Sequence, residues 1–272
     1  MKQIVHAGCT IHYRVFGSGT PLVLLHGFGT SGSVWVETAI TLSDQFLVIV
    51  PDLAGTGKSS ASKPLGWSLE KHADSIYSIL THEQIDRVTM IGHSMGGYIT
   101  LSFADRYQQH LDGIGLFCST AYADANTRKE NRTRAMAFIK QHGTLAYLKT
   151  SIPALFALQH RSDPMVASLI AENSEIEPDT LIAYQAAMRQ RMDYSDRLHE
   201  LNIPLLLVAG EQDEVISLQE SLKQCGRTMV TEWVVIPETG HMAMLEQPEK
   251  TVTVLRNFMR TLSFVTRYGK TN

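Results

Sequence analysis

The stretch that decides the fold runs from residue 88 to residue 107 and reads VTMIGHSMGGYITLSFADRY. It begins with a short apolar run, Val88–Ile91, which is typical of a strand buried on both faces of a parallel sheet. It ends in Tyr98–Tyr107, which has helical spacing. Between the two lies the pentapeptide Gly92-His93-Ser94-Met95-Gly96, a G-x-S-x-G motif. A tight strand-to-helix turn strains the backbone of the serine, so the positions two residues before and after it must lack side chains.

Short apolar runs of the same kind recur along the chain and alternate with segments of helical spacing. The runs comprise Pro21–Gly27, Phe46–Asp52, Ile114–Ser119, Pro204–Gly210 and Glu232–Glu238, and the half-buried alternating stretch Cys9–Gly17 precedes them. Helical segments are expected at Leu69–Leu80, which Ser68 precedes, and at Glu249–Leu262, which Pro248 opens. Buried strands that alternate with helices predict a doubly wound α/β domain.

The alternation is interrupted once, between residues 121 and 201. This segment has no strand-like run, and its helices are expected near Asn126–His142, Gly143–Leu158, Pro164–Glu172 and Pro178–Met192. The chain has 272 residues, which at about 150 residues per domain corresponds to one large domain that carries an insertion. We therefore predict a core domain of residues 1–120 and 202–272, with a helical insertion, 121–201, over the sheet.

Composition excludes several classes of protein. Hydrophobic residues make up 44% and charged residues 19%, so the chain can bury a substantial core. A net charge of −3 gives no global basic field, so we expect no nucleic-acid partner and no anionic membrane surface. The three cysteines form no metal-type pair. We expect neither a secretory leader nor a membrane span, because the first residues lack an apolar core and no apolar run approaches about 18 residues. We expect a soluble, cytoplasmic protein without membrane insertion.

Residues that directly follow the apolar runs are the candidates for chemistry, because ligands of open α/β sheets bind beyond the carboxyl ends of the strands. Ser94 is the candidate nucleophile, and the backbone N–H of Met95 is placed to bind an oxyanion. Serine needs a base, and His241 lies in the loop after the last strand. Asp213 follows the preceding strand and is the expected orienting acid, with Asp124 as the alternative. The chain order serine, aspartate, histidine is typical of this architecture.

Two other loops partly match sequence motifs of nucleotide-binding proteins. Gly27–Gly32 satisfies G-x-G-x-x-G, and Asp52 lies 20 residues beyond it, as in a dinucleotide-binding oxidoreductase. This NAD-binding interpretation is disfavoured because the strand lies well into the chain and Pro51 shapes the turn at Asp52. Gly57-Lys58-Ser59 resembles the end of a P-loop, but the first glycine of that motif is replaced by Asp52, which would repel a phosphate.

Taken together, these motifs resemble those of the α/β-hydrolase superfamily, over nearly the whole chain outside the insertion. His26–Gly29, HGFG, is similar to the oxyanion loop of that family, which implies the Phe28 N–H as a second donor beside that of Met95. Residues 52–59, DLAGTGKS, are similar to its structural D-x-x-G-x-G-x-S loop, and Gly240-His241 with 246–248 to its G-H…E-x-P ending. The resemblance implies a mostly parallel, eight-stranded twisted sheet flanked by helices, with the insertion as a cap.

The resemblance also narrows the chemistry. Epoxide hydrolases and haloalkane dehalogenases of this fold use aspartate where this chain has Ser94, so acyl chemistry is implied. The capped serine esterases are most similar, a group that includes enol-lactonases and carrier-protein methyl-ester carboxylesterases. We expect a serine hydrolase that cleaves a small-to-medium carboxylic ester, lactone or thioester through an acyl-enzyme, without metal or organic cofactor. Carbon–carbon bond hydrolase, cofactor-free haloperoxidase or perhydrolase, and non-catalytic ligand receptor stay open as alternatives.

The substrate side is less constrained by the sequence. Apolar residues beside the catalytic loops and in the insertion are expected to contact a small-molecule ester; they are Phe28, Tyr122, Met136, Phe156, Met188 and Met242. The helix expected at Asn126–Lys140 carries five cationic residues against Glu130. It is either a docking surface for an acidic carrier protein or a solvated helix face, and the second interpretation is favoured. Monomer and homodimer both stay open.

Overall fold

The computed structural model describes residues 1–60, 67–228 and 231–268. Its centre is an eight-stranded sheet with the order β1-β2-β4-β3-β5-β6-β7-β8. The strands are β1 (Lys2–His6), β2 (Cys9–Phe16), β3 (Thr20–Leu25), β4 (Phe46–Pro51), β5 (Val88–His93), β6 (Leu111–Phe117), β7 (Leu205–Gly210) and β8 (Thr231–Ile236). Strand β2 pairs antiparallel with both neighbours, and all remaining pairs are parallel. The predicted α/β-hydrolase fold class, with its mostly parallel sheet, is confirmed.

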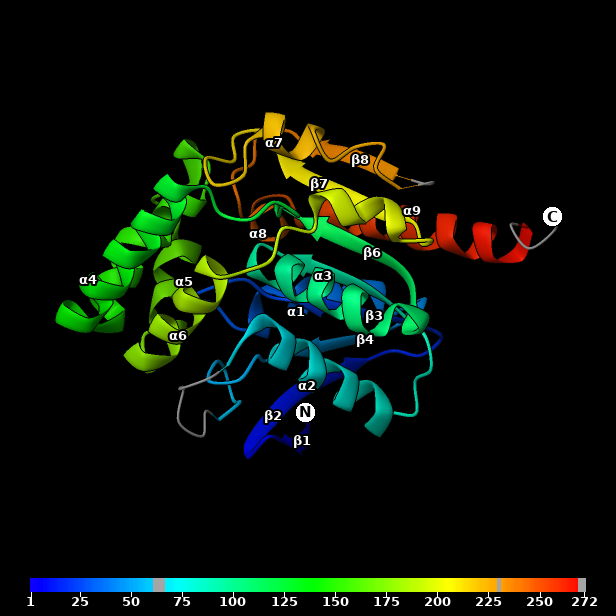
Figure 1. Ribbon diagram of the computed structural model, residues 1–272, viewed down its shortest axis with the longest axis horizontal. Helices are drawn as coiled ribbons and strands as arrows, with labels where there is room; N and C mark the ends of the chain where they lie inside the picture. The colour runs from blue at the N-terminus through cyan, green and yellow to red at the C-terminus, as the bar shows by residue number, and fades with distance from the viewer. Residues whose placement is uncertain (61–66, 229–230, 269–272) are drawn as a thin grey trace.

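Both faces of the sheet are covered by helices (Figure 1). On one face α2 (Leu69–His82) packs beside α3 (Met95–Tyr107), and on the other α1 (Val36–Leu42) packs beside α9 (Pro248–Tyr268). Strand β3 shows the two-residue period that this burial requires, since Val23 and Leu25 belong to the first core and Leu22 and Leu24 to the second. The continuous apolar runs of the sequence are therefore strands buried on both sides.

Strand β1 is the one element of the sheet that the apolar runs do not indicate. It reads KQIVH and lies at the edge, where most of its side chains are exposed. It pairs with β2 through a two-residue hairpin at Ala7 and Gly8, whose φ angles are +48° and +77°. Backbone pairing with β2, rather than burial of its side chains, therefore defines β1 as a strand.

The interruption of the alternation lies between β6 and β7, where the structure has α4 (Asn126–Ser151), α5 (Pro164–Asn173) and α6 (Pro178–Arg189). The two helices expected on either side of residue 143 follow each other directly in α4 and meet at a kink. The kink lies at Gly143, whose angles, φ 80° and ψ 175°, are not helical. Short 3-10 turns at Pro153–Leu155, Leu158–His160 and Ser195–Glu200 complete the segment. In Figure 1 the three helices stand together at one side of the sheet. We propose residues 121–201 as a cap domain on this basis.

Register places the ends of the central strands at one edge of the sheet. Leu25 in β3 pairs with Gly92 in β5, and Phe117 in β6 lies opposite both His93 and Val208. The loops after β3, β5, β6 and β7 therefore meet at this edge. No helix in the described ranges is long and apolar enough to cross a membrane.

Candidate active site

Ser94 occupies a sharp turn between β5 and α3. Its backbone angles, φ 50° and ψ −115°, lie outside the regions that a side chain favours, at a typical cost of about 1–3 kcal/mol. A Cβ atom at Gly92 would lie 2.2 Å from the carbonyl carbon of Gly96, and one at Gly96 would lie 2.7 Å from the Leu25 carbonyl oxygen. Both glycines are required because the turn brings backbone against backbone. The turn is pinned to β6 by the Ser94 N–H, which donates to the Phe117 carbonyl at 3.0 Å.

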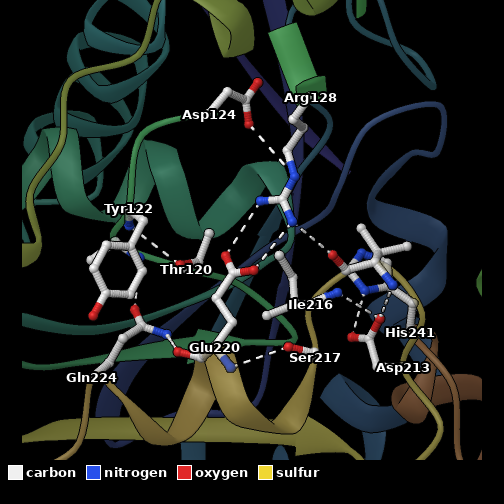
Figure 2. Close-up of polar contacts among 12 residues, drawn as sticks. Thr120, Tyr122, Asp124, Arg128, Asp213, Ile216, Ser217, Glu220, Gln224 and His241 are labelled. Atoms are coloured by element: carbon white, nitrogen blue, oxygen red, sulfur yellow. Dashed lines mark hydrogen bonds and ion pairs between the residues drawn. The ribbon is translucent and has the colours of Figure 1, made fainter. Parts of the chain in front are cut away.

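His241 and Asp213 form a buried pair. Nδ1 of His241 donates to Oδ2 of Asp213 at 2.8 Å, and the two side chains are 2% and 0% exposed. The other carboxylate oxygen, Oδ1, accepts the backbone N–H groups of Val215 at 2.7 Å and Ile216 at 3.0 Å (Figure 2). Three donors converge on this carboxylate and fix its orientation toward His241. With Nδ1 as the donor, Nε2 of His241 is left as a hydrogen-bond acceptor.

The loop that carries His241 is fixed by the carboxylate of Glu246. This carboxylate accepts the N–H of Gly240 at 3.0 Å, that of Met242 at 3.2 Å and that of Ala157 at 2.8 Å. The N–H of His241 itself donates to the Leu155 carbonyl at 2.7 Å. Residues 155–157, which follow α4, are thus attached directly to the histidine loop. The glutamate of the E-x-P ending, Glu246, is needed because its carboxylate binds the N–H groups of both segments.

Two further histidines near the turn, His93 and His26, form hydrogen bonds to backbone groups. His93 donates from Nε2 to the His241 carbonyl at 2.9 Å, and burial, aided by the neighbouring His241, holds its pKa well below the ordinary value. His26 accepts the Leu53 N–H on Nε2 at 3.0 Å, and burial lowers its pKa to about 4. Both imidazoles are therefore neutral near pH 7.

The Rossmann-type interpretation of the glycine-rich loop is wrong, because Asp52 serves a structural purpose. Its buried carboxylate accepts the N–H of Gly32 and that of Lys58, each at 3.0 Å, and pairs with Arg14 at 3.0 Å. A Cβ at Gly57 would lie 2.4 Å from the same carboxylate. Both oxygens of Asp52 thus hold the protein's own groups, and the glycines serve close packing around this carboxylate.

Ser94 and His241 line one cavity of about 150 Å³. The core also supplies Phe28 and Tyr98 to its lining, and the inserted segment supplies Arg132, Tyr147, Gln185 and Met188. Among the described residues no direct hydrogen bond joins the Ser94 hydroxyl to His241, a contact that is often long in ligand-free enzymes and shortens when substrate binds. The candidate oxyanion donors fit this arrangement, since Phe28 lines the cavity and Met95 is the first residue of α3. Neither N–H is used by another group in the ranges that the structure describes.

The structure places the six predicted substrate contacts in different surroundings. Phe28 and Met188 line the cavity. Phe156 and Met242 are 1% and 0% exposed and belong to the hydrophobic core rather than to the cavity lining. Neither Tyr122 nor Met136 is part of the lining; the Tyr122 hydroxyl donates to the Lys223 carbonyl at 3.4 Å.

Arg132, Tyr147 and Gln185 are cavity residues that reasoning from the sequence missed. Arg132 was counted among the cations of a basic helix, yet it is turned inward and paired with Asp124. Asp124 also pairs with Arg191 at 2.5 Å. Burial raises the pKa of Asp124, but the hydrogen bond and charge of Arg132, followed by those of Arg191, outweigh it and hold that pKa below its ordinary value. Asp124 is therefore occupied by arginines and does not contact His241.

Arg128 ties the first cap helix to the loop that carries Asp213 (Figure 2). Its guanidinium donates to Glu220 at 3.2 Å and to the Val215 carbonyl at 3.1 Å. Val215 is the residue whose N–H donates to Asp213. Arg128 and Arg132 are thus paired with carboxylates, whereas Arg134 and Lys140 on the same helix are exposed, so the favoured interpretation of a solvated face holds for part of the helix.

Metal-type donors come together at Cys118, Asp213 and His241, whose ligand atoms lie within 4.8 Å of one another in the part of the chain described. Asp213 and His241 already bond to each other. Burial raises the pKa of the Cys118 thiol well above its ordinary value and keeps it protonated. A protonated thiol is a poor metal ligand, so this trio does not favour a metal centre.

Comparisons with known proteins identify the family and the fold. A family model described as the alpha/beta hydrolase fold matches residues 20–248. An esterase structure from Thermogutta terrifontis is 28% identical, with a TM-score of 0.90, and covers 96% of this chain and 99% of its own. The enol-lactonase structure from Burkholderia xenovorans has a TM-score of 0.87 at 20% identity, with 95% and 100% covered, and shares the fold. The pimeloyl-[acyl-carrier protein] methyl ester esterase of Vibrio atlanticus is 25% identical over 92% of this chain and 98% of its own.

Proposed function

The chain belongs to the α/β-hydrolase family and is a hydrolase of the ester type, and we propose that it cleaves small-to-medium carboxylic esters, lactones or thioesters through an acyl-enzyme on Ser94. One observation carries the proposal. His241, which is joined to the buried carboxylate of Asp213 at 2.8 Å, lines the same cavity as a serine held at a strained strand-to-helix turn. This combination is what nucleophilic catalysis by serine requires.

In the first half-reaction Oγ of Ser94 forms a bond to the ester carbonyl carbon while its proton passes to Nε2 of His241. Asp213 holds the ring in the tautomer that can accept this proton and stabilises the imidazolium. The oxyanion is bound by the N–H groups of Met95 and Phe28, each worth about 3 kcal/mol in the transition state. Collapse of the tetrahedral intermediate breaks the bond to the alcohol oxygen, which takes the proton from His241.

In the second half-reaction a water molecule takes the place of the alcohol. His241 removes one of its protons as the water oxygen bonds to the acyl carbon, and the same proton then returns to Oγ as the acyl bond to Ser94 breaks. The net change is one ester bond cleaved by one water. Every proton transfer runs through Nε2, the nitrogen that the Asp213 hydrogen bond leaves free.

The test is the hydrolysis of p-nitrophenyl esters from acetate to dodecanoate by the wild type, Ser94→Ala and Ser168→Ala. Ser168 is an exposed serine in α5 and provides the matched control. We expect turnover by the wild type and the control and none above background by Ser94→Ala. Equal rates for all three proteins would refute the proposal. Failure of every ester would favour the carbon–carbon hydrolase, perhydrolase or receptor alternatives.

A further inference from the structure

The wall of the cavity that α4 and α6 provide is polar. Nη1 of Arg132 donates to Oε1 of Gln185 at 3.1 Å, and Nε2 of Gln185 donates to the Tyr147 hydroxyl at 3.1 Å. All three residues line the cavity that contains Ser94. Gln185 is 4% exposed and the Arg132 side chain 14%. A pocket for a purely hydrocarbon acyl chain has no use for such groups, because an apolar ligand would strip water from them without replacing its hydrogen bonds.

The charge of this wall is not fully balanced. Arg132 and Arg191 share the single carboxylate of Asp124, while Arg128, 3.9 Å from Asp124, has Glu220 as its own partner at 3.2 Å. Three guanidinium groups thus stand against two carboxylates within ion-pairing distance, a net charge of 3 − 2 = +1. Arg132 is the member of this cluster that reaches the cavity.

Arg191 cannot present the excess charge to a ligand. Its side chain is 2% exposed, its guanidinium lies 4.1 Å from the centre of the Tyr98 ring, and it donates to the Tyr122 carbonyl. Arg132 is therefore the guanidinium of this cluster that a ligand in the cavity with Ser94 can contact.

Hydrogen-bond donors also remain for an anion. A guanidinium has five N–H groups, and those of Arg132 reach Asp124, Gln185 and the sulfur of Met188, which is a weak acceptor at 3.3 Å. The second N–H of Nη2 has no acceptor among the described residues. Tyr98 lines the same cavity, is 4% exposed, and its hydroxyl has no hydrogen-bond partner in the described ranges.

We propose that Arg132, Gln185 and Tyr98 form a subsite for a carboxylate of the substrate, so that the preferred substrates are esters that carry a second, ionised carboxyl group. The inference rests on the proposed function, since it places the subsite in the same cavity as Ser94. Apolar residues, among them Phe28 and Ile152, complete the lining and suit the carbon chain between the two ends. A guanidinium matches a carboxylate in shape and charge.

The test compares matched esters by the acid released at constant pH 7.5. One arm pairs monomethyl esters of straight-chain dicarboxylic acids, from malonate to adipate, with methyl esters of monocarboxylic acids of equal carbon number. A second arm pairs O-acetylglycolate with ethyl acetate and places the carboxylate on the alcohol side. We expect the best anionic ester of one arm to exceed its neutral partner about tenfold or more in kcat/KM, as one charge-assisted contact allows. The arm that shows the preference identifies the part of the substrate that carries the carboxylate.

Two variants assign the preference to the subsite. Arg132→Met should lower kcat/KM for the anionic ester at least tenfold, mainly through KM, while the neutral ester changes much less. Arg132→Lys should recover part of the loss, because it restores the charge without the planar fork. Arg134→Met is the control, since Arg134 is an exposed cation on the same helix that donates to Asn131 and does not line the cavity. Melting temperatures of all variants show whether each is folded.

Several outcomes would overturn the inference. Wild type that cleaves neutral and anionic esters equally well, with both reactions dependent on Ser94, refutes the subsite and leaves the proposed function intact. An Arg132→Met variant that loses both activities to the same extent also refutes it. If no ester is cleaved, the proposed function fails, and glutarate is then used as a binding probe. A rise in melting temperature for the wild type and Arg134→Met but not for Arg132→Met supports the subsite, and no rise in any protein refutes it.

Discussion

Replacement of Asp213 by asparagine changes one atom and should nearly abolish turnover. In the structure Oδ1 of Asp213 accepts two backbone N–H groups, from Val215 and Ile216, and Oδ2 accepts Nδ1–H of His241. The amide oxygen of an asparagine is the acceptor that the two backbone donors require. Its NH₂ group is therefore forced toward His241.

The consequence is a change of tautomer. An NH₂ group that faces Nδ1 makes this nitrogen an acceptor, so the proton of the neutral ring moves to Nε2. A protonated Nε2 cannot take the proton of Ser94, and loss of this role costs about 10⁴ in kcat in other triads. At 1.36 kcal/mol for each tenfold change, this is about 5.4 kcal/mol of transition-state stabilisation.

The assay is kcat for the best p-nitrophenyl ester, measured for Asp213→Asn beside Glu214→Gln. Glu214 is the neighbouring carboxylate, is 69% exposed and pairs with Arg161, so its amide variant controls for loss of charge in the same loop. We expect the control to retain wild-type turnover within about threefold, as is usual for surface pairs of this kind. Near-normal kcat in a folded Asp213→Asn protein would refute the tautomer argument and move the acid role to another residue.

Three further predictions concern the supports of the site. Gly92→Ala places a methyl group 2.2 Å from the Gly96 backbone, so we expect ester hydrolysis to be lost. The melting temperature should also fall, because overpacking of this kind typically costs about 1–3 kcal/mol of stability. A fully active, stable variant would contradict the packing argument. Arg128→Met removes the contact to the Val215 carbonyl and should lower kcat about tenfold with little change in KM, whereas a change in KM alone would point to substrate contact instead. Burial lowers the pKa of His72 to about 3. Below pH 6.5 this histidine is therefore protonated in the unfolded chain but stays neutral in the folded one, which at pH 5 lowers the free energy of unfolding by about 2 kcal/mol. His72→Phe should therefore lose less stability than the wild type between pH 7 and pH 5 in urea unfolding, and parallel losses would contradict the assignment.

The sequence predicts the fold and the loops of the site well because both depend on local patterns. Apolar runs four to six residues long become strands, and Ser94 and His241 are found because each directly follows one of them. Strand β1 escapes this reasoning because it is defined by pairing with β2 at an exposed edge.

The cavity wall could not be predicted because it depends on which way helical side chains turn. Arg132 and Arg134 are two residues apart on one helix and look alike in a charge count, but only the first meets a buried carboxylate, Asp124. Phe156 and Met242 are apolar and close to the catalytic loops, yet they are buried in the core and do not line the cavity. Such distinctions arise from tertiary contacts between the inserted segment and the core.

The central claim is that Ser94 is the nucleophile activated by His241, and covalent labelling tests it most directly. The protein is incubated with a p-nitrophenyl alkylphosphonate, which phosphonylates activated serines, and the adduct is located by mass spectrometry of the intact chain and its peptides. We predict one adduct per chain, on Ser94, absent from Ser94→Ala and formed at least a hundredfold more slowly in His241→Ala. An unmodified Ser94 in a protein that hydrolyses esters, or equal labelling rates in the wild type and His241→Ala, would contradict the account.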